Sequence, residues 1–260
     1  MNPSDTLFTI VGPVAFLTFN RPGTGNAMTW AMYDALVAAC ERVDLDRDLR
    51  VFVVRGAGGA FGTGTDIRQF AEFSSSGDGL DYERRLETAL DRLERVSVPT
   101  IAQVEGIAAG AGCAIALACD LRVATPTARF GVPIARTLGN GLSAENCQRL
   151  VEHLGLPRAK DVLLTGRFID APEASAIGLV TRLAEPAGIA AAVDELAGVI
   201  ARNAPLTLRA MKDTLRRLSR RGRVEAGDTR DLIAACYASH DFREGVTAFL
   251  EKRPPKFTGS

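Results

Sequence analysis

The chain has 260 residues, of which 47% are hydrophobic and 24% charged, and its 31 basic residues balance 31 acidic ones. This length suits one large α/β domain, with or without a helical appendage. Zero net charge argues against nucleic acid as a partner, since that would call for an excess of Lys and Arg. The polar start lacks the order of a signal peptide, and no apolar run approaches the roughly 20 residues of a membrane span. We therefore expect a cytoplasmic protein without a membrane partner.

Cysteine and histidine usage argues against disulfides and metal sites. The cysteines are odd in number, include no CxxC pair and mostly fall on apolar faces; they are Cys40, Cys113, Cys119, Cys147 and Cys236. We interpret them as reduced core residues. The only histidines are His153 and His240, so we expect no bound metal and no histidine-based catalytic triad.

The first half of the chain predicts strands that alternate with helices. Strands are expected over residues 6–10, 14–19 and 51–54, the first two joined by a hairpin turn at Gly12-Pro13. Apolar residues at helical spacing predict a helix over 29–43, with Thr29 as its N-cap. Strand, helix and strand in this order favour parallel neighbours in an α/β sheet.

A Gly-rich loop over 56–64 then leads into a short helix at Ile67. Such a loop between a strand and a helix is also typical of dinucleotide-binding folds. The loop does not spell GxGxxG, and the acidic residue expected after the next strand is missing, so we reject that alternative. The Ser/Gly-rich tract 74–79 is expected to be mobile, and a helix is expected over 81–96.

The most informative stretch is VPTIAQVEGIAAGAGCAIALACD, residues 98–120. Residues 100–104 predict a buried strand, because Pro99 blocks a helix and β-branched residues follow. A turn of small residues then opens an apolar helix, whose first N–H groups lack intrahelical partners and can stabilise a negative oxygen. This pattern indicates an oxyanion site in outline. The alternative is a tight packing turn between strand and helix.

The second half predicts short strands and then mainly helices. Strands are expected over 121–124, 128–131 and 179–183. Helices are expected over 143–154, 158–164 and 171–177, with Ser143 as the N-cap of the first. Helices dominate from Gly188 onward, and their arginines are expected to form a solvated face; these are Arg216, Arg217, Arg220, Arg221 and Arg223.

Several motifs, in their order along the chain, resemble the crotonase (enoyl-CoA hydratase/isomerase) superfamily. They are NRPGTGNAM, RGAGGAFGTGTDI, VEGIAAGAGCAIALACDLRVA, ARFGVP, LLTGRFIDAPEASAIGLV and REGVTAFLEKRPPKF, and they cover nearly the whole chain. The resemblance implies an α/β fold, a crotonase-like spiral of ββα units with a C-terminal helical region. It implies an acyl-CoA-binding core over 1–200 and a helical trimerisation or lid region over 201–260.

The resemblance also implies assembly as a homotrimer or hexamer. Apolar residues on the C-terminal helices favour such an assembly, because one domain core would not cover them all. These residues are Leu206, Leu208, Leu215, Leu218, Leu232, Ile233 and Tyr237.

Members of this superfamily hold the thioester carbonyl of an acyl-coenzyme A with two backbone N–H groups, and the matching positions are Thr65 and Ala111. Each such donor can contribute about 3 kcal/mol of transition-state stabilisation, because charge grows on the oxygen as an enolate forms. Ala111 stands where glycine is common, which would cost about 1 kcal/mol if that residue needed a left-handed backbone.

The resemblance implies that coenzyme A enters as part of the substrate, with no tightly bound cofactor. The matching contact positions are Ala27 and Thr63, together with Lys252, which would reach the nucleotide phosphates from a neighbouring subunit. A basic contact usual after NRP is missing, since Thr24-Gly25 occupies its place.

The departures from the family pattern concern its carboxylates. Hydratases carry glutamates at the positions of Ala114 and Ile134, and some dienoyl isomerases carry a carboxylate at the position of Ser143. Ala114, Ile134 and Ser143 carry no carboxyl group, so we expect this chain to hydrate crotonyl-CoA poorly. Glu145 is the nearest carboxylate and the candidate acid/base, with a helix-dipole role as the alternative.

Three further acidic residues receive structural interpretations. Asp66 is expected to brace its loop, Glu105 to point away from the pocket, and Asp120 to be structural.

The leading hypothesis is an acyl-CoA lyase or isomerase that stabilises a thioester enolate and performs isomerisation, decarboxylation or hydrolysis in place of two-glutamate hydration. The alternative from a different class is an acyl-CoA-binding protein with weak or no catalysis. A third hypothesis, action on a free carbonyl substrate as in the diketone hydrolases, ranks last because those enzymes use histidines that are scarce here.

Overall fold

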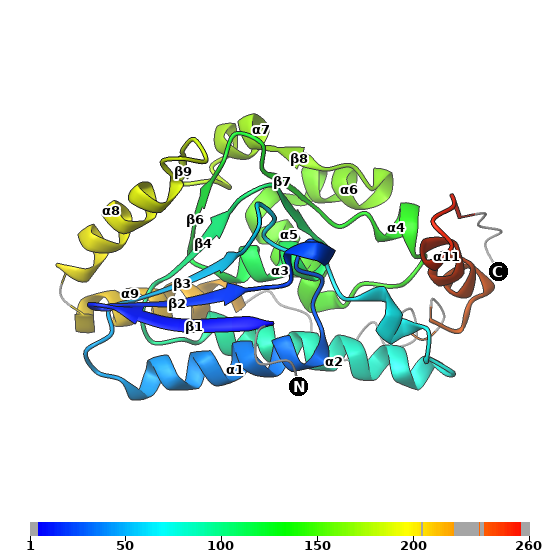
Figure 1. Ribbon diagram of the computed structural model, residues 1–260, viewed down its shortest axis with the longest axis horizontal. Coiled ribbons are helices and arrows are strands. Elements are labelled where there is room, and N and C mark those ends of the chain that lie inside the picture. The colour runs from blue at the N-terminus through cyan, green and yellow to red at the C-terminus, as the bar shows by residue number, and fades with distance from the viewer. Residues whose placement is uncertain (1–4, 204, 221–233, 235–236, 256–260) are drawn as a thin grey trace.

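The computed structural model describes residues 5–203, 205–220, 234 and 237–255 (Figure 1). Its main sheet has six strands in the order β1-β2-β3-β4-β6-β9. They are β1 (Thr6–Val11), β2 (Val14–Phe19), β3 (Val51–Gly56), β4 (Thr100–Val104), β6 (Leu121–Ala124) and β9 (Arg182–Leu183). β1 and β2 form an antiparallel hairpin, and each later pair of neighbours is parallel.

A smaller sheet lies beside the ends of these strands. It contains β5 (Ile107–Ala109), β7 (Arg129–Gly131) and β8 (Ile169–Asp170). β5 pairs parallel with β7, and β7 pairs antiparallel with β8. β5 follows β4 and β7 follows β6 along the chain, and β8 leads through α7 to β9. The chain therefore passes repeatedly between the two sheets, which confirms the α/β spiral that the motifs predict.

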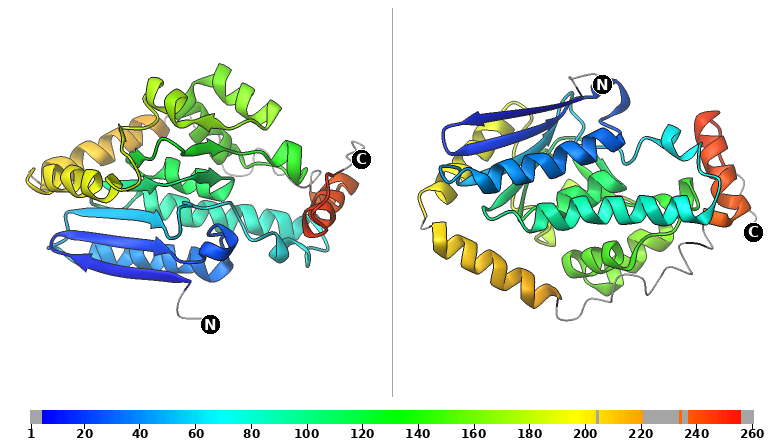
Figure 2. Two further views of the ribbon diagram at one scale, coloured as in Figure 1. Left: turned by 45° about the horizontal axis from the view of Figure 1, so that its top comes forward. Right: turned by 90° about the horizontal axis from the view of Figure 1, so that it is seen from below.

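Helices surround both sheets. Those of the core are α1 (Trp30–Leu45), α2 (Ser76–Glu94), α3 (Ala111–Ala118), α4 (Ile134–Thr137), α5 (Ala144–Leu154), α6 (Leu156–Thr165), α7 (Ala171–Ala176) and α8 (Ile189–Ala201). Short 3-10 helices η1 (Pro22–Thr24) and η2 (Ile67–Phe70) lie in loops, and α9 (Pro205–Arg220) and α11 (His240–Leu250) follow the core. α1 and α2 lie side by side, whereas α8 packs on β3, β4 and β6 (Figure 2).

The central strands are buried on both faces, which explains their continuous apolar runs. In β3, Phe52 and Val54 belong to the main core cluster, whereas Val51 and Val53 belong to a second cluster under α8. Side chains of a strand alternate between faces, so one apolar run serves two layers.

Most predicted elements are confirmed, as are two predicted helix caps. The Thr29 hydroxyl accepts a hydrogen bond from the Met32 N–H at the start of α1. The Ser143 hydroxyl accepts one from the Asn146 N–H at the start of α5. β5 was not predicted, and only Arg182–Leu183 of the strand predicted over 179–183 pairs with the sheet.

The prediction of a mobile tract over 74–79 is wrong, because α2 begins at Ser76. The Asp78 carboxylate accepts hydrogen bonds from the Ser74 and Ser75 N–H groups, each at 2.8 Å. These two hydrogen bonds lower the pKa of Asp78, and the bond from Ser74 has the largest effect. A serine N-cap followed three residues later by an acid, here Ser75 and Asp78, is typical of a helix start. The prediction missed this pattern because the tract contains few hydrophobic residues.

Burial is confirmed for three of the cysteines that the structure describes. Cys40, Cys113 and Cys119 are free and buried, and burial raises the pKa of each thiol to about 12. Cys147 is free and half-buried, and Cys236 lies outside the described residues. Among the described residues no group of three His, Cys, Asp or Glu could hold a metal ion. None of the helices described is long and apolar enough to cross a membrane.

The C-terminal helices leave part of their apolar surface exposed. On α9, Met211 and Leu215 are 58% and 66% exposed, whereas Leu208 packs against the core cluster under α8. Tyr237 was wrongly placed on this surface, because it is buried in an aromatic cluster with Phe73 and Phe242.

The remaining residues of those C-terminal predictions lie outside the described structure. They are Leu232, Ile233, Arg221 and Arg223, with the side chains of Leu206, Leu218, Arg217 and Arg220. The division of the chain at residue 200 and the trimeric or hexameric assembly stay predictions.

Candidate active site

Two glycine-rich turns pack directly against each other where β3 and β4 lead toward helices. The Phe61 and Gly62 N–H groups donate to the Ile107 carbonyl at 3.1 and 3.0 Å, and the Ala109 N–H donates to the Gly62 carbonyl at 2.8 Å. Gly112 permits this approach, because a Cβ at that position would lie 2.3 Å from the Gly62 oxygen. The glycines therefore bring two distant loops into backbone contact.

This contact brings the segments of Thr65 and Ala111 together. Their preceding residues, Gly64 and Gly110, have φ values of 104° and 51°. A Cβ added at Gly64 would lie 3.9 Å from the Ala111 nitrogen. Neither the Thr65 nor the Ala111 N–H donates to another described residue. Two backbone donors are thus available in adjoining turns, and a shared oxygen site stays a prediction.

Ala111 carries no conformational penalty. It is the first residue of α3 and is not among the residues with positive φ, because Gly110 takes the left-handed position. The cost considered for an alanine at this position therefore does not arise.

A buried chain of hydroxyl groups holds the Thr65 side chain. Its Oγ1 lies 2.6 Å from the Tyr33 hydroxyl and 2.9 Å from the Tyr82 hydroxyl. Burial raises the pKa of both phenols, so they stay protonated at neutral pH. Hydrogen bonds on both sides hold the Thr65 side chain in one rotamer and so restrain its position in the loop.

Asp66 braces the same loop, as predicted. Its carboxylate accepts hydrogen bonds from Arg68 at 2.7 Å and from Arg21 at 3.1 Å. These bonds, chiefly that from Arg68, lower the pKa of Asp66. The Asp66 carboxylate is therefore paired with these two arginines and stabilises the loop.

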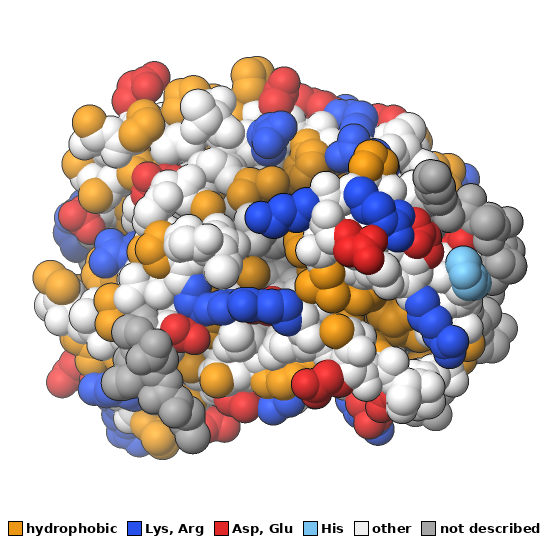
Figure 3. All heavy atoms as spheres, turned by 45° about the vertical axis from the view of Figure 1, so that its right-hand side comes forward, with side chains coloured by type: hydrophobic (Ala, Val, Ile, Leu, Met, Phe, Trp, Pro, Cys, Tyr) orange, Lys and Arg blue, Asp and Glu red, His pale blue; other side chains and the backbone are white. Residues whose placement is uncertain are grey.

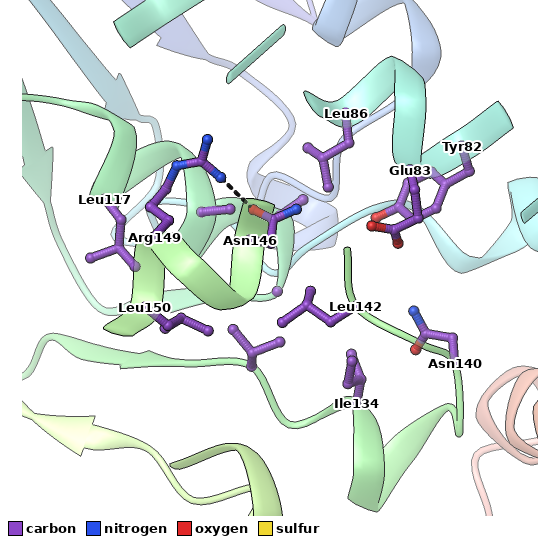
Figure 4. Close-up of a pocket in the computed structure, with 14 residues that line it drawn as sticks. Tyr82, Glu83, Leu86, Leu117, Ile134, Asn140, Leu142, Asn146, Arg149 and Leu150 are labelled. Atoms are coloured by element: carbon purple, nitrogen blue, oxygen red, sulfur yellow. Dashed lines mark hydrogen bonds between the residues drawn. The ribbon is translucent and has the colours of Figure 1, made fainter. Parts of the chain in front are cut away.

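A pocket opens beside Ala111 (Figure 4). Its walls come from α2, α3, α4 and α5 and are mainly apolar. The lining residues are Tyr82, Glu83, Leu86, Gly110, Ala111, Ala114, Leu117, Val132, Ile134, Asn140, Leu142, Asn146, Arg149 and Leu150. Ala114 and Ile134, which stand at the glutamate positions of the hydratases, are thus both pocket residues.

Glu83 is the one carboxyl group among the described residues that line this pocket. It comes from α2 and is only 4% exposed. The Ser143 N–H donates to its Oε2 at 3.2 Å, and the Tyr237 hydroxyl donates to its Oε1 at 3.5 Å. No cationic side chain of the described residues lies within 4.0 Å of it. Burial, as the largest cause, raises the pKa of Glu83 to about 8.

Sequence reasoning missed Glu83, although a signal was present. Glu83, Leu86, Leu90 and Leu93 recur at helical spacing on α2, and the three leucines are buried. An acid on the apolar face of a helix is unusual and marks a group with a special environment.

The next acid on α2 belongs to a buried ion-pair cluster. The Arg149 guanidinium is 1% exposed and contacts Glu87 at 2.9 Å and Glu94 at 2.7 Å. It also donates to the Asn146 side-chain oxygen at 2.7 Å (Figure 4). One arginine thus pairs with both carboxylates and links α2 to α5, which indicates a structural role.

Glu145, the predicted acid/base, lies in the first turn of α5 and is half-buried. It is not among the residues that line the pocket. Glu105 accepts a hydrogen bond from Gln103 and also lies outside the lining. Asp120 accepts from the Thr100 N–H and from Lys212, each at 2.7 Å, which confirms its structural role.

Two of the predicted coenzyme A contacts meet at one loop. The Thr63 N–H donates to the Gly25 carbonyl at 3.1 Å, and the Ala27 N–H donates to the Thr24 carbonyl at 3.3 Å. Lys252 lies at the end of α11, which packs on η2, and is exposed. Figure 3 shows basic and acidic side chains interspersed on the side of the molecule that carries the C-terminal end.

Comparisons with known proteins place the chain in one family. Residues 9–260 match the model of the family described as enoyl-CoA hydratase/isomerase. The chain is 37% identical over 248 residues to the 2,3-dehydroadipyl-CoA hydratase of Escherichia coli, covering 95% of each sequence. It is 32% identical over 250 residues to the short-chain-enoyl-CoA hydratase of Clostridium acetobutylicum, covering 93% of each. A structure of methylmalonyl-CoA decarboxylase with 2-nitronate-propionyl-CoA superposes with a TM-score of 0.89 at 26% identity, covering 98% of both chains.

Proposed function

The chain belongs to the enoyl-CoA hydratase/isomerase family, and from that premise we propose that it binds an acyl-CoA thioester and stabilises its enolate. The contact between the turns of Gly64-Thr65 and Gly110-Ala111 is the observation that carries the proposal. It leaves two backbone donors beside an apolar pocket. Each donor aimed at the thioester oxygen contributes about 3 kcal/mol as negative charge develops there.

The pocket walls favour a reaction other than hydration. Ala114 and Ile134 line the pocket with alkyl side chains that cannot orient water or transfer protons. We propose isomerisation or decarboxylation, in which the enolate forms and a carbon atom is then protonated. The similarity to methylmalonyl-CoA decarboxylase supports a fold that accommodates chemistry of this kind.

Crotonyl-CoA hydration is the direct test of this assignment. A general acid or base contributes a factor of about 10² to 10⁴, so we expect hydration at least about a hundredfold slower than by a two-glutamate hydratase measured in parallel. A panel of acyl-CoA thioesters, followed by mass spectrometry, then identifies those that bind and those that are converted. Efficient crotonyl-CoA hydration would contradict the proposed reaction class, and binding without conversion of any thioester would favour an acyl-CoA-binding protein.

Gly112→Ala tests the contact between the turns. The new methyl group would collide with the Gly62 carbonyl, so the Ala111 N–H should move and turnover should fall at least about tenfold. Gly198→Ala is the matched control, because its Cβ would meet only the end of the Arg202 side chain, at 3.6 Å. Equal turnover by both variants would contradict the assignment of this contact to the site.

We further propose a homotrimer or hexamer, in which Lys252 of one subunit reaches the coenzyme A of the next. The exposed Met211 and Leu215 on α9 support an apolar contact between subunits. Light scattering should give a trimer or hexamer mass. A monomer at micromolar concentration would contradict this assembly.

A further inference from the structure

We propose that Glu83 takes a proton from the α-carbon of the bound thioester and returns it. The inference rests on the proposed function, because the resulting enolate must be held by the Thr65 and Ala111 N–H groups. In this step the C–H bond breaks, an O–H bond forms on Glu83, and the electron pair of the C–H bond becomes the carbon–carbon double bond of the enolate. The thioester oxygen receives the negative charge. Return of the proton to the same or another carbon completes exchange or isomerisation.

The position of Glu83 supports this role. It reaches the pocket from α2, whereas Ala111 and Ala114 reach it from α3, so the carboxyl group and the candidate oxyanion donor belong to different walls of one cavity. Figure 4 shows the Glu83 carboxyl group projecting toward the space bounded by Leu142, Asn140 and Ile134. An acyl chain in this space would lie between the donor and the acid.

Ser143 holds the Glu83 carboxyl group from a second helix. The N–H of Ser143, the N-cap of α5, donates to the Glu83 carboxylate at 3.2 Å. The carboxyl group of α2 is therefore held at the start of α5, whose Asn146 and Leu150 also line the pocket.

The surroundings of Glu83 allow it to lose and regain a proton. The groups that influence Glu83 or respond to it come from four elements or segments; they are Tyr33, Tyr82, Glu87, Glu145, Cys147 and Tyr237. The cationic Arg149 also lines the pocket, where it is paired with Glu87 and Glu94. Burial and the charges of Glu87 and Glu145 favour its neutral form, whereas bonds from Ser143 and Tyr237 favour its charged form. With a pKa of about 8, both forms are populated near neutral pH.

The other acidic candidates are less suited to the role. Glu87 is paired with Arg149 and lies outside the pocket lining, as does Glu145. The Tyr82 hydroxyl lines the pocket, but it is bonded to Thr65 and burial raises its pKa well above 10. Among the described residues, Glu83 is therefore the acidic group that both lines the pocket and can gain or lose a proton near neutral pH.

Hydrogen exchange at the α-carbon tests the inference without knowledge of the natural acyl group. Butyryl-CoA incubated with the protein in D₂O should gain deuterium at its α-carbon, as followed by mass spectrometry. Glu83→Gln keeps the shape and removes the proton chemistry, so the exchange rate should fall at least about a hundredfold while butyryl-CoA binding changes less than about threefold. Glu152→Gln removes the same charge from an exposed position of α5 and should exchange like the unmodified protein.

The pH profile separates proton transfer from a structural role. The exchange rate of the unmodified protein should rise with pH and level off above about 8, because the deprotonated carboxylate is the base. Glu83→Asp retains a carboxylate at a greater distance, so its slower exchange should still depend on pH. This variant also keeps the test available if the glutamine variant does not fold.

The outcomes distinguish the inference from the proposed function. Exchange by Glu83→Gln within threefold of the unmodified protein would overturn the role of Glu83 and leave enolate formation intact. A hundredfold loss in Glu145→Gln alone would transfer the role to Glu145. Absence of exchange in the unmodified protein, with butyryl-CoA and crotonyl-CoA both bound, would overturn the proposed function and this inference with it.

Discussion

Glu83 and Glu87 lie one turn apart on α2, and their carboxyl groups differ in their partners. Loss of water is the largest influence on both, and it raises both pKa values. Glu87 contacts the Arg149 guanidinium, whose charge counteracts part of that effect. Among the described residues, Glu83 accepts hydrogen bonds from an amide and a phenol and has no cationic partner. Burial makes both charges costly, and the partner decides how much of that cost is offset.

This difference separates two uses of a buried acid. A carboxylate paired with arginine links helices, as Glu87 and Glu94 link α2 to α5 through Arg149. A carboxyl group without a cation shifts its titration toward neutral pH, where a proton donor or acceptor is most effective. Four single substitutions can break or sharpen the comparison.

Arg149→Met should have the largest effect. It leaves Glu87 and Glu94 in the wall without their cation, which should cost about 3–5 kcal/mol of unfolding free energy, as measured by urea denaturation. The triple variant Arg149→Met, Glu87→Gln, Glu94→Gln should recover most of that loss, because it removes the uncompensated charges. A loss below about 1 kcal/mol in the single variant would show that the cluster is not a compensated unit.

Glu83→Gln should stabilise the protein at alkaline pH. The pKa of Glu83 is about 8 in the folded protein and near 4.5 when unfolded, so the unfolded chain binds fewer protons between these values and stability falls as pH rises through this window. The glutamine variant lacks this loss. Its melting temperature should exceed that of the unmodified protein by about 5 °C at pH 9, and the difference should vanish near pH 4.

Glu87→Gln is the matched comparison for that measurement. Burial also raises the pKa of Glu87, but Arg149 offsets part of that effect, so Glu87→Gln should raise the melting temperature at pH 9 by less than Glu83→Gln does. An equal or larger rise in the Glu87→Gln variant would contradict the distinction between the two acids.

Tyr237→Phe should have the smallest effect. The Tyr237 hydroxyl donates to the Glu83 carboxylate over 3.5 Å and favours its charged form. Its removal should raise the pKa of Glu83 further, and the midpoint of the exchange profile should move upward by a few tenths of a pH unit. A downward movement would show that the phenol stabilises the protonated carboxyl group instead.

The local part of the fold was predictable, because its causes lie close together in the sequence. Pro99 and the β-branched residues after it predicted β4 correctly, and Thr29 and Ser143 predicted two helix starts. The family motifs marked the segments of Thr65 and Ala111. The prediction of a mobile tract over 74–79 was wrong because it relied on composition. It gave too little weight to the capping pattern, in which Ser74 and Ser75 donate to Asp78.

The chemistry of the pocket was less predictable, because it depends on contacts between distant residues. The partners of Glu83 are 60 and 154 positions away, and neither distance follows from a periodic pattern. Glu145 was chosen for its nearness in sequence to the vacant positions. The structure shows that proximity along the chain does not place a side chain in the lining.

The buried hydroxyl chain through Thr65 links a residue with a candidate backbone donor to the stability of the core. Valine at this position would keep the shape but leave two buried phenols without their central partner. The same bonds that keep those phenols satisfied also hold the peptide plane in place before any thioester arrives. In the proposed reaction, water would have to rotate its dipoles toward the forming enolate, whereas the Thr65 peptide would already be oriented, so the reorganisation would be completed during folding and not during each turnover.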